Sequence, residues 1–183
     1  MVQIAAMLAN GFEEVEALAV IDILRRADIK TDMISISECK KVTGAHNIFI
    51  EADMLLDDIE LEEYSGIFLP GGMPGTNNLD GCRKLCKAIL DFDREKKLLA
   101  AICAAPKIYG RLGILEGRKA VCYPGMENYL TGAEVRMQDK VVKDGHIITS
   151  RGMGTAIDLG LALVAELKNK SISEELASAI QYI

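Results

Sequence analysis

Cys103 is the residue whose surroundings most resemble a reactive site. It follows a short apolar run, 98–102, and a helical pattern begins directly after it. Two positions before and after it stand Ala101 and Ala105, and a sharp strand-to-helix turn that presents a nucleophile needs small side chains there. A nearby helix N-terminus is expected to lower the thiol pKa. The pattern predicts a cysteine nucleophile, with a buried structural cysteine as the alternative.

Two glycine- or carboxylate-bearing segments could complete such a site. Pro70-Gly71-Gly72 follows the apolar run 67–69 and could offer free N–H groups. With the N–H of Ala104 they would form an oxyanion hole, although an ordinary turn has the same composition. The first predicted helix is expected to face inward at Val15, Leu18 and Ala19. In the run 11–16, Glu16 lies closest to this apolar stripe and could be a general acid or base. Acidic residues that only complement the helix dipole are the alternative.

The other cysteines and the histidines are interpreted as packing or surface residues. Cys82 and Cys86 lie four apart on a predicted helix, Cys39 is in a polar turn, and Cys122 is on an apolar strand. His46 lies in a turn region and His146 in a hairpin. Neither histidine follows Cys103, so a papain-like hydrolytic triad has little support.

Composition excludes several classes of function. The 183 residues suggest one domain, 1–183, and the net charge of −6 argues against nucleic-acid or anionic-membrane binding. The odd number of cysteines, five, favours reduced thiols, and the sequence contains neither a signal-peptide pattern nor a membrane-spanning run. We therefore expect a cytoplasmic protein. Zinc-ligand spacing and the usual nucleotide-binding patterns are missing from the sequence, so no metal and no cofactor is expected.

Apolar runs and helical patterns alternate along the chain. Strands are predicted at 2–8, 29–37, 67–69, 98–102 and 120–123, and helices at 13–27, 79–97, 104–112, 155–167 and 173–182. A hairpin is predicted at 141–149, and a turn at Gly44 with a short strand at 47–50. Several strands are apolar on both faces, which indicates an α/β fold with a parallel sheet between helices. Ligands bind beyond the carboxyl ends of such strands, which directs attention to the loops after Leu8, Leu69 and Ile102.

Four segments together resemble the ThiJ/PfpI superfamily (class I glutamine amidotransferase-like), in the branch of the Parkinson-associated protein deglycase, the "DJ-one" family. The resemblance spans nearly the whole chain in matching order, and it is carried by the segments 11–16, 69–72, 100–106 and 149–155. It implies a flavodoxin-like three-layer sandwich and a homodimer to which the first helix and the region near His46 contribute.

The resemblance also implies roles for individual residues. The redox-sensitive nucleophile falls on Cys103, its carboxyl partner on Glu16, and the facing N–H groups on Gly72 and Ala104. The pocket residues it implies are Gly71, Arg26, His46 and Tyr123. Three positions depart from relatives: Ala104 replaces the histidine of many proteases, Tyr123 replaces a histidine, and His46 replaces an arginine.

The activity implied by the resemblance is a cofactor-independent glyoxalase or deglycase that acts on methylglyoxal-type aldehydes or glycated groups, and protects against oxidative stress. Binding of nucleic acid is expected only where the nucleic acid is a glycated substrate. The alternative is a non-enzymatic redox sensor or stress chaperone in which Cys103 is oxidised to a sulfinate. A cysteine hydrolase is the third option, and it needs a base that the sequence does not supply.

Overall fold

A computed structural model describes residues 2–182. Residues 1 and 183 of the predicted domain lie outside the described residues. The central sheet has seven strands in the order β10-β11-β7-β6-β1-β2-β5, and all neighbours are parallel except β10 and β11. Its strands are β1 (Gln3–Leu8), β2 (Lys30–Ser35), β5 (Met54–Leu55), β6 (Gly66–Leu69), β7 (Leu98–Ile102), β10 (Val141–Asp144) and β11 (Ile147–Ser150).

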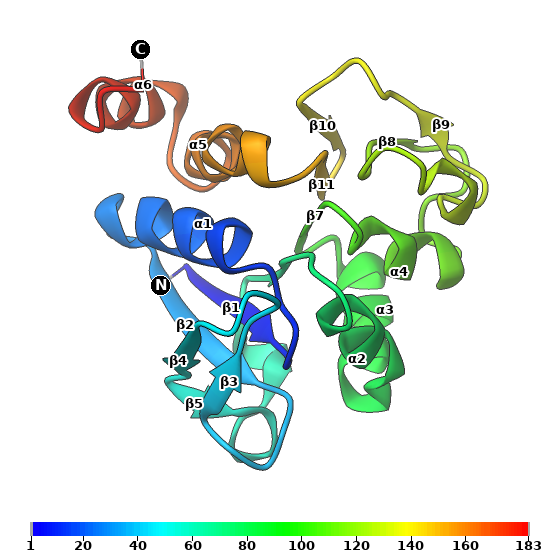
Figure 1. Cartoon of the computed structure of the whole chain (residues 1–183). Coiled ribbons are helices and arrows are strands. Elements are labelled where there is room, and N and C mark those ends of the chain that lie inside the picture. The colour runs from blue at the N-terminus through cyan, green and yellow to red at the C-terminus, as the bar shows by residue number, and fades with distance from the viewer. Residues whose placement is uncertain (1, 183) are drawn as a thin grey trace.

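Helices cover both faces of this sheet (Figure 1). On one face lie α1 (Glu14–Arg26), α5 (Ala156–Leu167) and α6 (Lys170–Ala179); on the other lie α2 (Gly75–Gly81), α3 (Arg83–Glu95) and α4 (Pro106–Arg111). Short 3₁₀ turns occur at η1 (Leu56–Asp58), η2 (Leu61–Glu63), η3 (Glu127–Tyr129) and η4 (Met153–Thr155). This arrangement confirms the predicted three-layer α/β fold with a mostly parallel sheet.

The strand β7 shows why its residues form a buried central strand. All of its side chains are buried, and they alternate between two hydrophobic cores. Leu99 and Ala101 face α3 and α4, whereas Ala100 and Ile102 face α1 and α5. Burial on both faces requires an apolar run with no polar interruption, and this run leads directly into Cys103.

Two of the predicted helices differ from the observed ones. The helix expected at 79–97 is divided at Cys82, whose backbone is extended (φ −79°, ψ 101°), so that α2 and α3 are separate. The last helix begins at Lys170, before the predicted Ser173, because the side chain of Asn169 caps it by accepting the N–H of Ile172 at 3.0 Å.

Two small sheets lie outside the main one. The strands β3 (Lys41–Thr43) and β4 (Phe49–Glu51) form an antiparallel hairpin in the region where only a turn at Gly44 and one short strand were predicted. The strands β8 (Lys119–Ala120) and β9 (Glu134–Val135) pair in parallel. The helices of residues 2–182 do not include one that is long and apolar enough to cross a membrane.

Candidate active site at Cys103

Cys103 occupies a strained turn between β7 and α4. Its φ is +64°, a left-handed conformation that residues with a side chain rarely adopt. Its N–H donates to the carbonyl of Ser150 at 2.9 Å, and its own carbonyl accepts the N–H of Tyr123 at 2.8 Å. The flanking Ala101 and Ala105 are fully buried. The surrounding loops therefore hold the cysteine in the elbow geometry that the sequence predicts.

Backbone N–H groups from two loops face the sulfur. The N–H groups of Gly72 and Ala104 face the thiol of Cys103 and act to lower its pKa. Gly72 adopts φ +91°, and a Cβ there would lie 2.3 Å from the backbone nitrogen of Glu13, so only glycine fits. The loops after β6 and β7 thus meet as expected, because these strands are neighbours in the sheet.

Glu16 is the carboxyl that reaches the thiol. Glu13 is the N-cap of α1, accepting the N–H of Glu16 at 2.7 Å, and this start of the helix turns Glu16 inward until it is fully buried. Its Oε2 accepts the N–H of Gly71 at 2.9 Å, and the carboxyl interacts with the thiol of Cys103. Its Oε1 is buried and has no hydrogen-bond partner among residues 2–182.

The two side chains share one electrostatic environment. Burial raises the pKa of Glu16 to about 7, against the opposing effect of its contact with the thiol. Burial, then the charge of Glu16 and the contact with it, raise the pKa of Cys103 to about 12, while the N–H groups of Ala104 and Gly72 act in the other direction. The expectation of a lowered thiol pKa is therefore wrong. The helix α4 has only six residues, and its dipole does not outweigh burial and a neighbouring carboxylate.

A pocket of about 670 Å³ opens in front of this pair. The residues that line it come from α1, the β3–β4 hairpin and the loops around Cys103, β10 and β11: Glu13, Glu16, His46, Cys103, Tyr123, Pro124, Lys140, Arg151, Gly152, Met153, Gly154 and Thr155. His46 and Tyr123 thus lie where they were predicted. Gly71 is not among the residues that line the pocket, but it lies beside the pair, since a Cβ on it would be 2.5 Å from Oε2 of Glu16 and 3.1 Å from Sγ of Cys103.

Arg26 does not reach this pocket, which corrects its predicted placement. It lies at the far end of α1, ten residues after Glu16, and a helix rises about 1.5 Å per residue. There it pairs with Asp22 at 2.6 Å and lines a different hollow beside Ile157 and Ile180.

Each of the two histidines forms a hydrogen bond with a neighbouring carboxylate. The exposed ring of His46 bonds Glu14 at 2.9 Å, and this contact raises its pKa. Glu13, Glu14 and His46 lie close enough for a metal ion, but Glu14 already accepts the N–H and ring nitrogen of His46, so an ion pair explains the cluster. His146 is packed against Asp93 at 2.8 Å.

The other cysteines are free and lie apart from this pocket. Cys39 is exposed and Cys122 is buried in the core, as predicted. Cys82 and Cys86 are half-buried at the start of α3, and Sγ of Cys86 accepts a hydrogen bond from Arg111 at 3.2 Å.

Sequence reasoning missed the wall formed by Lys140 and residues 151–155. The segment 149–155 contributes to the family resemblance, yet none of its residues was assigned to the site. The hairpin pattern at 141–149 does not specify the strand beside which it packs, whereas in the structure β11 runs parallel to β7 and ends at the same edge of the sheet. The residues after Ser150 must therefore lie beside Cys103.

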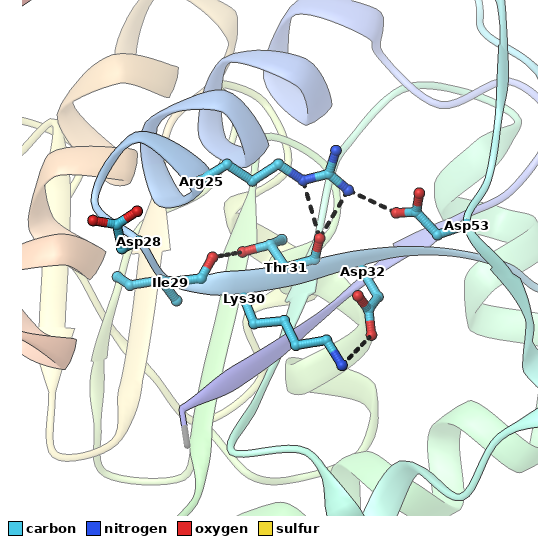
Figure 2. Close-up of a pocket in the computed structure, with 7 residues that line it drawn as sticks. All are labelled: Arg25, Asp28, Ile29, Lys30, Thr31, Asp32 and Asp53. Atoms are coloured by element: carbon cyan, nitrogen blue, oxygen red, sulfur yellow. Dashed lines mark hydrogen bonds and ion pairs between the residues drawn. The ribbon is translucent and has the colours of Figure 1, made fainter.

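A second hollow, near the end of α1, differs from the Cys103 pocket in the side chains that line it (Figure 2). Arg25 donates to the carbonyl of Thr31 at 2.8 Å and pairs with Asp53 at 2.6 Å. Lys30 lies 3.9 Å from Asp32. The basic side chains that line this hollow are thus paired with its own carboxylates, and its lining residues do not include a cysteine.

The fold and the site define a flavodoxin-like α/β protein with a cysteine elbow and a buried carboxyl partner. Residues 2–166 match the DJ-1/PfpI family, and the chain belongs to this family. It is 32% identical to the oxidised DJ-1 of Toxoplasma gondii, whose structure it matches with a TM-score of 0.94 over 99% of this chain and 98% of that one.

Curated relatives support the same membership. The chain is 37% identical over 174 residues to DJ-1 homolog B of Arabidopsis thaliana, covering 94% of this chain but 40% of that protein. It thus spans less than half the length of that relative. It is also 32% identical over 147 residues to a protein named deglycase from Pyrococcus horikoshii, covering 79% of this chain and 87% of that protein.

Proposed function

We propose that this protein is a cofactor-independent enzyme that converts reactive 2-oxoaldehydes to hydroxy acids, and that it releases amines or thiols from their adducts with such aldehydes. The observation that carries the proposal is the juxtaposition of the Cys103 thiol and the buried Glu16 carboxyl, with two N–H groups facing the sulfur. The Pyrococcus relative named a deglycase is consistent with this chemistry.

The first step forms a bond between sulfur and the aldehyde carbon. The Glu16 carboxylate accepts the thiol proton, so that the negative charge moves from oxygen to sulfur while the net charge of the pair is unchanged. The sulfur of Cys103 then attacks the aldehyde carbon of methylglyoxal. Glu16 passes the thiol proton to the resulting alkoxide oxygen, which gives a hemithioacetal and leaves Glu16 as a carboxylate again. The N–H groups of Gly72 and Ala104 are close enough to this centre to stabilise the developing oxyanion.

The later steps move one proton between two carbons. Glu16 removes the hydrogen from the former aldehyde carbon and the resulting enediol is protonated at the neighbouring carbon, which leaves a lactoyl thioester on Cys103. Water hydrolyses the thioester to lactate and the free thiol. The aldehyde carbon is oxidised and the keto carbon reduced, so no external redox cofactor is required.

Replacing the nucleophile tests this function. Cys103→Ser should abolish lactate production from methylglyoxal. Cys86→Ser removes another half-buried thiol outside the pocket and should retain full activity. Lactate formation by Cys103→Ser at the wild-type rate would rule out the proposed mechanism.

A second candidate function, redox sensing, is favoured by the N–H groups of Gly72 and Ala104, since they would also stabilise a Cys103 sulfinate. Peroxide should then add two oxygens to Cys103 and leave the buried Cys122 unmodified, which mass spectrometry of peptides can measure. This oxidation without any aldehyde turnover would favour sensing over catalysis.

We further propose a cytoplasmic homodimer built from one domain. The five free thiols support a reducing compartment. Large apolar side chains are exposed on α1 and on the β3–β4 hairpin, the elements expected at the dimer contact: Val15, Leu18, Ile48 and Phe49.

A further inference from the structure

Arg151 is the one pocket residue whose positive charge has no carboxylate partner among residues 2–182. The pocket contains two permanently charged basic side chains, Lys140 and Arg151. Lys140 pairs with Asp158 at 3.1 Å, and the hydroxyl of Tyr182 also donates to this carboxylate, at 2.5 Å. The guanidinium of Arg151 is bonded only through Nη1, which donates to the carbonyl of Met137 at 3.2 Å. Its remaining N–H groups are available to a ligand.

The position of Arg151 is set by the backbone beside the nucleophile. Its N–H is directed at the carbonyl of Lys140 at 3.4 Å, and the residue before it, Ser150, accepts the N–H of Cys103. The side chain is half-buried and lines the same pocket as Cys103. A guanidinium is always charged and offers parallel donors that match a carboxylate or a phosphate.

The carboxyl groups and the permanently charged basic groups of the pocket come from different elements. Glu13 and Glu16 lie at the start of α1, with His46 near Glu13, while Lys140 and Arg151 come from segments that flank β10 and β11. Methylglyoxal is uncharged and small, and it has no anionic group with which a guanidinium could form an ion pair. An acyclic oxoaldehyde with a terminal anionic group would use both ends of the pocket, with its aldehyde at Cys103 and its anion at Arg151.

We infer that Arg151 forms an anion-binding subsite that makes the protein selective for 2-oxoaldehydes bearing a carboxylate or phosphate at the end remote from the aldehyde. This inference rests on the proposed function for the reaction, but the subsite itself does not depend on turnover. The reaction is the same internal oxidation and reduction: the test compound 4,5-dioxopentanoate would take up one water and give 2-hydroxyglutarate.

Alkylation of Cys103 tests the subsite independently of catalysis. Iodoacetate carries a carboxylate and iodoacetamide does not, while both transfer a two-carbon group to sulfur and release iodide. The nearby carboxyls of Glu13 and Glu16 alone would disfavour iodoacetate. With the subsite, the rate ratio of iodoacetate to iodoacetamide at Cys103, divided by the same ratio for free N-acetylcysteine, should be roughly ten, which corresponds to about 1.4 kcal/mol.

Three variants assign the preference to Arg151. Arg151→Met should reduce the normalised ratio to one or below, and Arg151→Lys should restore part of it because the charge is retained. Arg136→Met removes a cation outside the pocket, one paired with Glu134, and should leave the ratio unchanged. A wild-type ratio below one, or a ratio that Arg151→Met does not alter, would overturn the inference.

Substrate selectivity provides the second measurement. The carboxylate-bearing 4,5-dioxopentanoate should be converted with a higher kcat/KM than 2-oxopentanal, in which a methyl group replaces the carboxylate, and Arg151→Met should abolish this difference. If no oxoaldehyde is turned over but the alkylation preference is present, the proposed function fails and the subsite stands. If Cys103 resists both reagents, calorimetric titration with 2-hydroxyglutarate decides: binding lost in Arg151→Met supports the subsite, and absence of binding to the wild type overturns it.

Discussion

The buried carboxyl of Glu16 and the thiol of Cys103 interact directly at the carboxyl end of β7, although they are 87 positions apart in the sequence. The two buried groups cannot both carry a negative charge. While Glu16 is ionised, the proton therefore stays on the sulfur of Cys103 until the thiol reacts. Gly71 fixes the carboxyl through its N–H at 2.9 Å. The proton shared by this pair determines both the reactivity of the thiol and part of the pH dependence of folding.

Removal of the Glu16 charge should separate thiol acidity from catalysis. Glu16→Gln removes the repulsion that raises the pKa of Cys103, so the thiol pKa should fall below that of the wild type. Turnover of methylglyoxal should nevertheless decrease about 100-fold or more, because the amide cannot carry the proton between carbons.

Two measurements check this pair of effects. The pH dependence of thiolate absorbance, in a background where the other four cysteines are serine, reports the thiol pKa. Lactate formation reports turnover. An unchanged thiol pKa in Glu16→Gln would contradict the electrostatic coupling, and unchanged turnover would remove Glu16 from the proposed mechanism.

The same carboxyl should make the protein less stable as pH rises toward neutrality. The pKa of Glu16 is raised from 4.5 to about 7 by burial, so between these values the folded state binds more protons than the unfolded state. The contribution of this residue is therefore fully present below pH 4.5 and is lost as pH rises through about 7. Its magnitude is on the order of 3 kcal/mol.

Urea unfolding of the wild type and Glu16→Gln, at pH 5 and at pH 8, measures this contribution. The variant retains an acceptor for Gly71 without a charge, so it should be more stable than the wild type at pH 8 and should lose less stability between the two values. If the unfolding free energy changed by the same amount between pH 5 and pH 8 in both proteins, Glu16 would ionise at the same pH in the folded and unfolded states.

The local parts of this site could be predicted from the sequence. An apolar run that ends at Cys103 between small residues predicts an elbow, because such a turn has no room for bulky side chains on either side, although a buried structural cysteine can follow the same pattern. The inward direction of Glu16 is predicted correctly, but from the wrong stripe, because Val15 and Leu18 are exposed. Glu16 faces inward because it lies on the same side of α1 as the buried Val20, Ile23 and Leu24. Both features depend on residues that are close in the chain.

The remaining parts depend on packing between distant segments. Arg151 enters the pocket because β11 pairs with β7 in parallel, and a hairpin pattern alone does not specify that neighbour. The family resemblance predicts Arg26 as a pocket residue, but Arg26 lies at the end of α1 that is remote from the pocket. The raised pKa of the Cys103 thiol arises from burial, which only the packed structure specifies.

Gly71 should tolerate no side chain, for steric reasons. A Cβ there would lie 2.5 Å from Oε2 of Glu16 and 2.6 Å from Cβ of Cys103. Gly71→Ala should therefore displace the pair, abolish most of the turnover and cost about 1–3 kcal/mol of unfolding free energy. Denaturant titration and lactate formation measure the two losses.

The matched control is Gly81→Ala, at the end of α2. A Cβ at this position would have nothing within 4 Å. Full activity and unchanged or slightly higher stability are expected, because alanine favours helix more than glycine does. Equal behaviour of the two variants would mean that the space around Gly71 does not hold the pair in place.

The proposed homodimer predicts different effects for two equally exposed leucines. Leu18 on α1 is 37% exposed and Leu90 on α3 is 38% exposed, but only Leu18 lies on an element that the proposal places at the dimer contact. A buried glutamate without a partner is costly at an interface, so Leu18→Glu should shift the protein to monomers in sedimentation velocity. Leu90→Glu adds the same charge on the other side of the sheet and should leave the dimer intact. A monomeric wild type, or dissociation by both variants, would argue against an interface at α1.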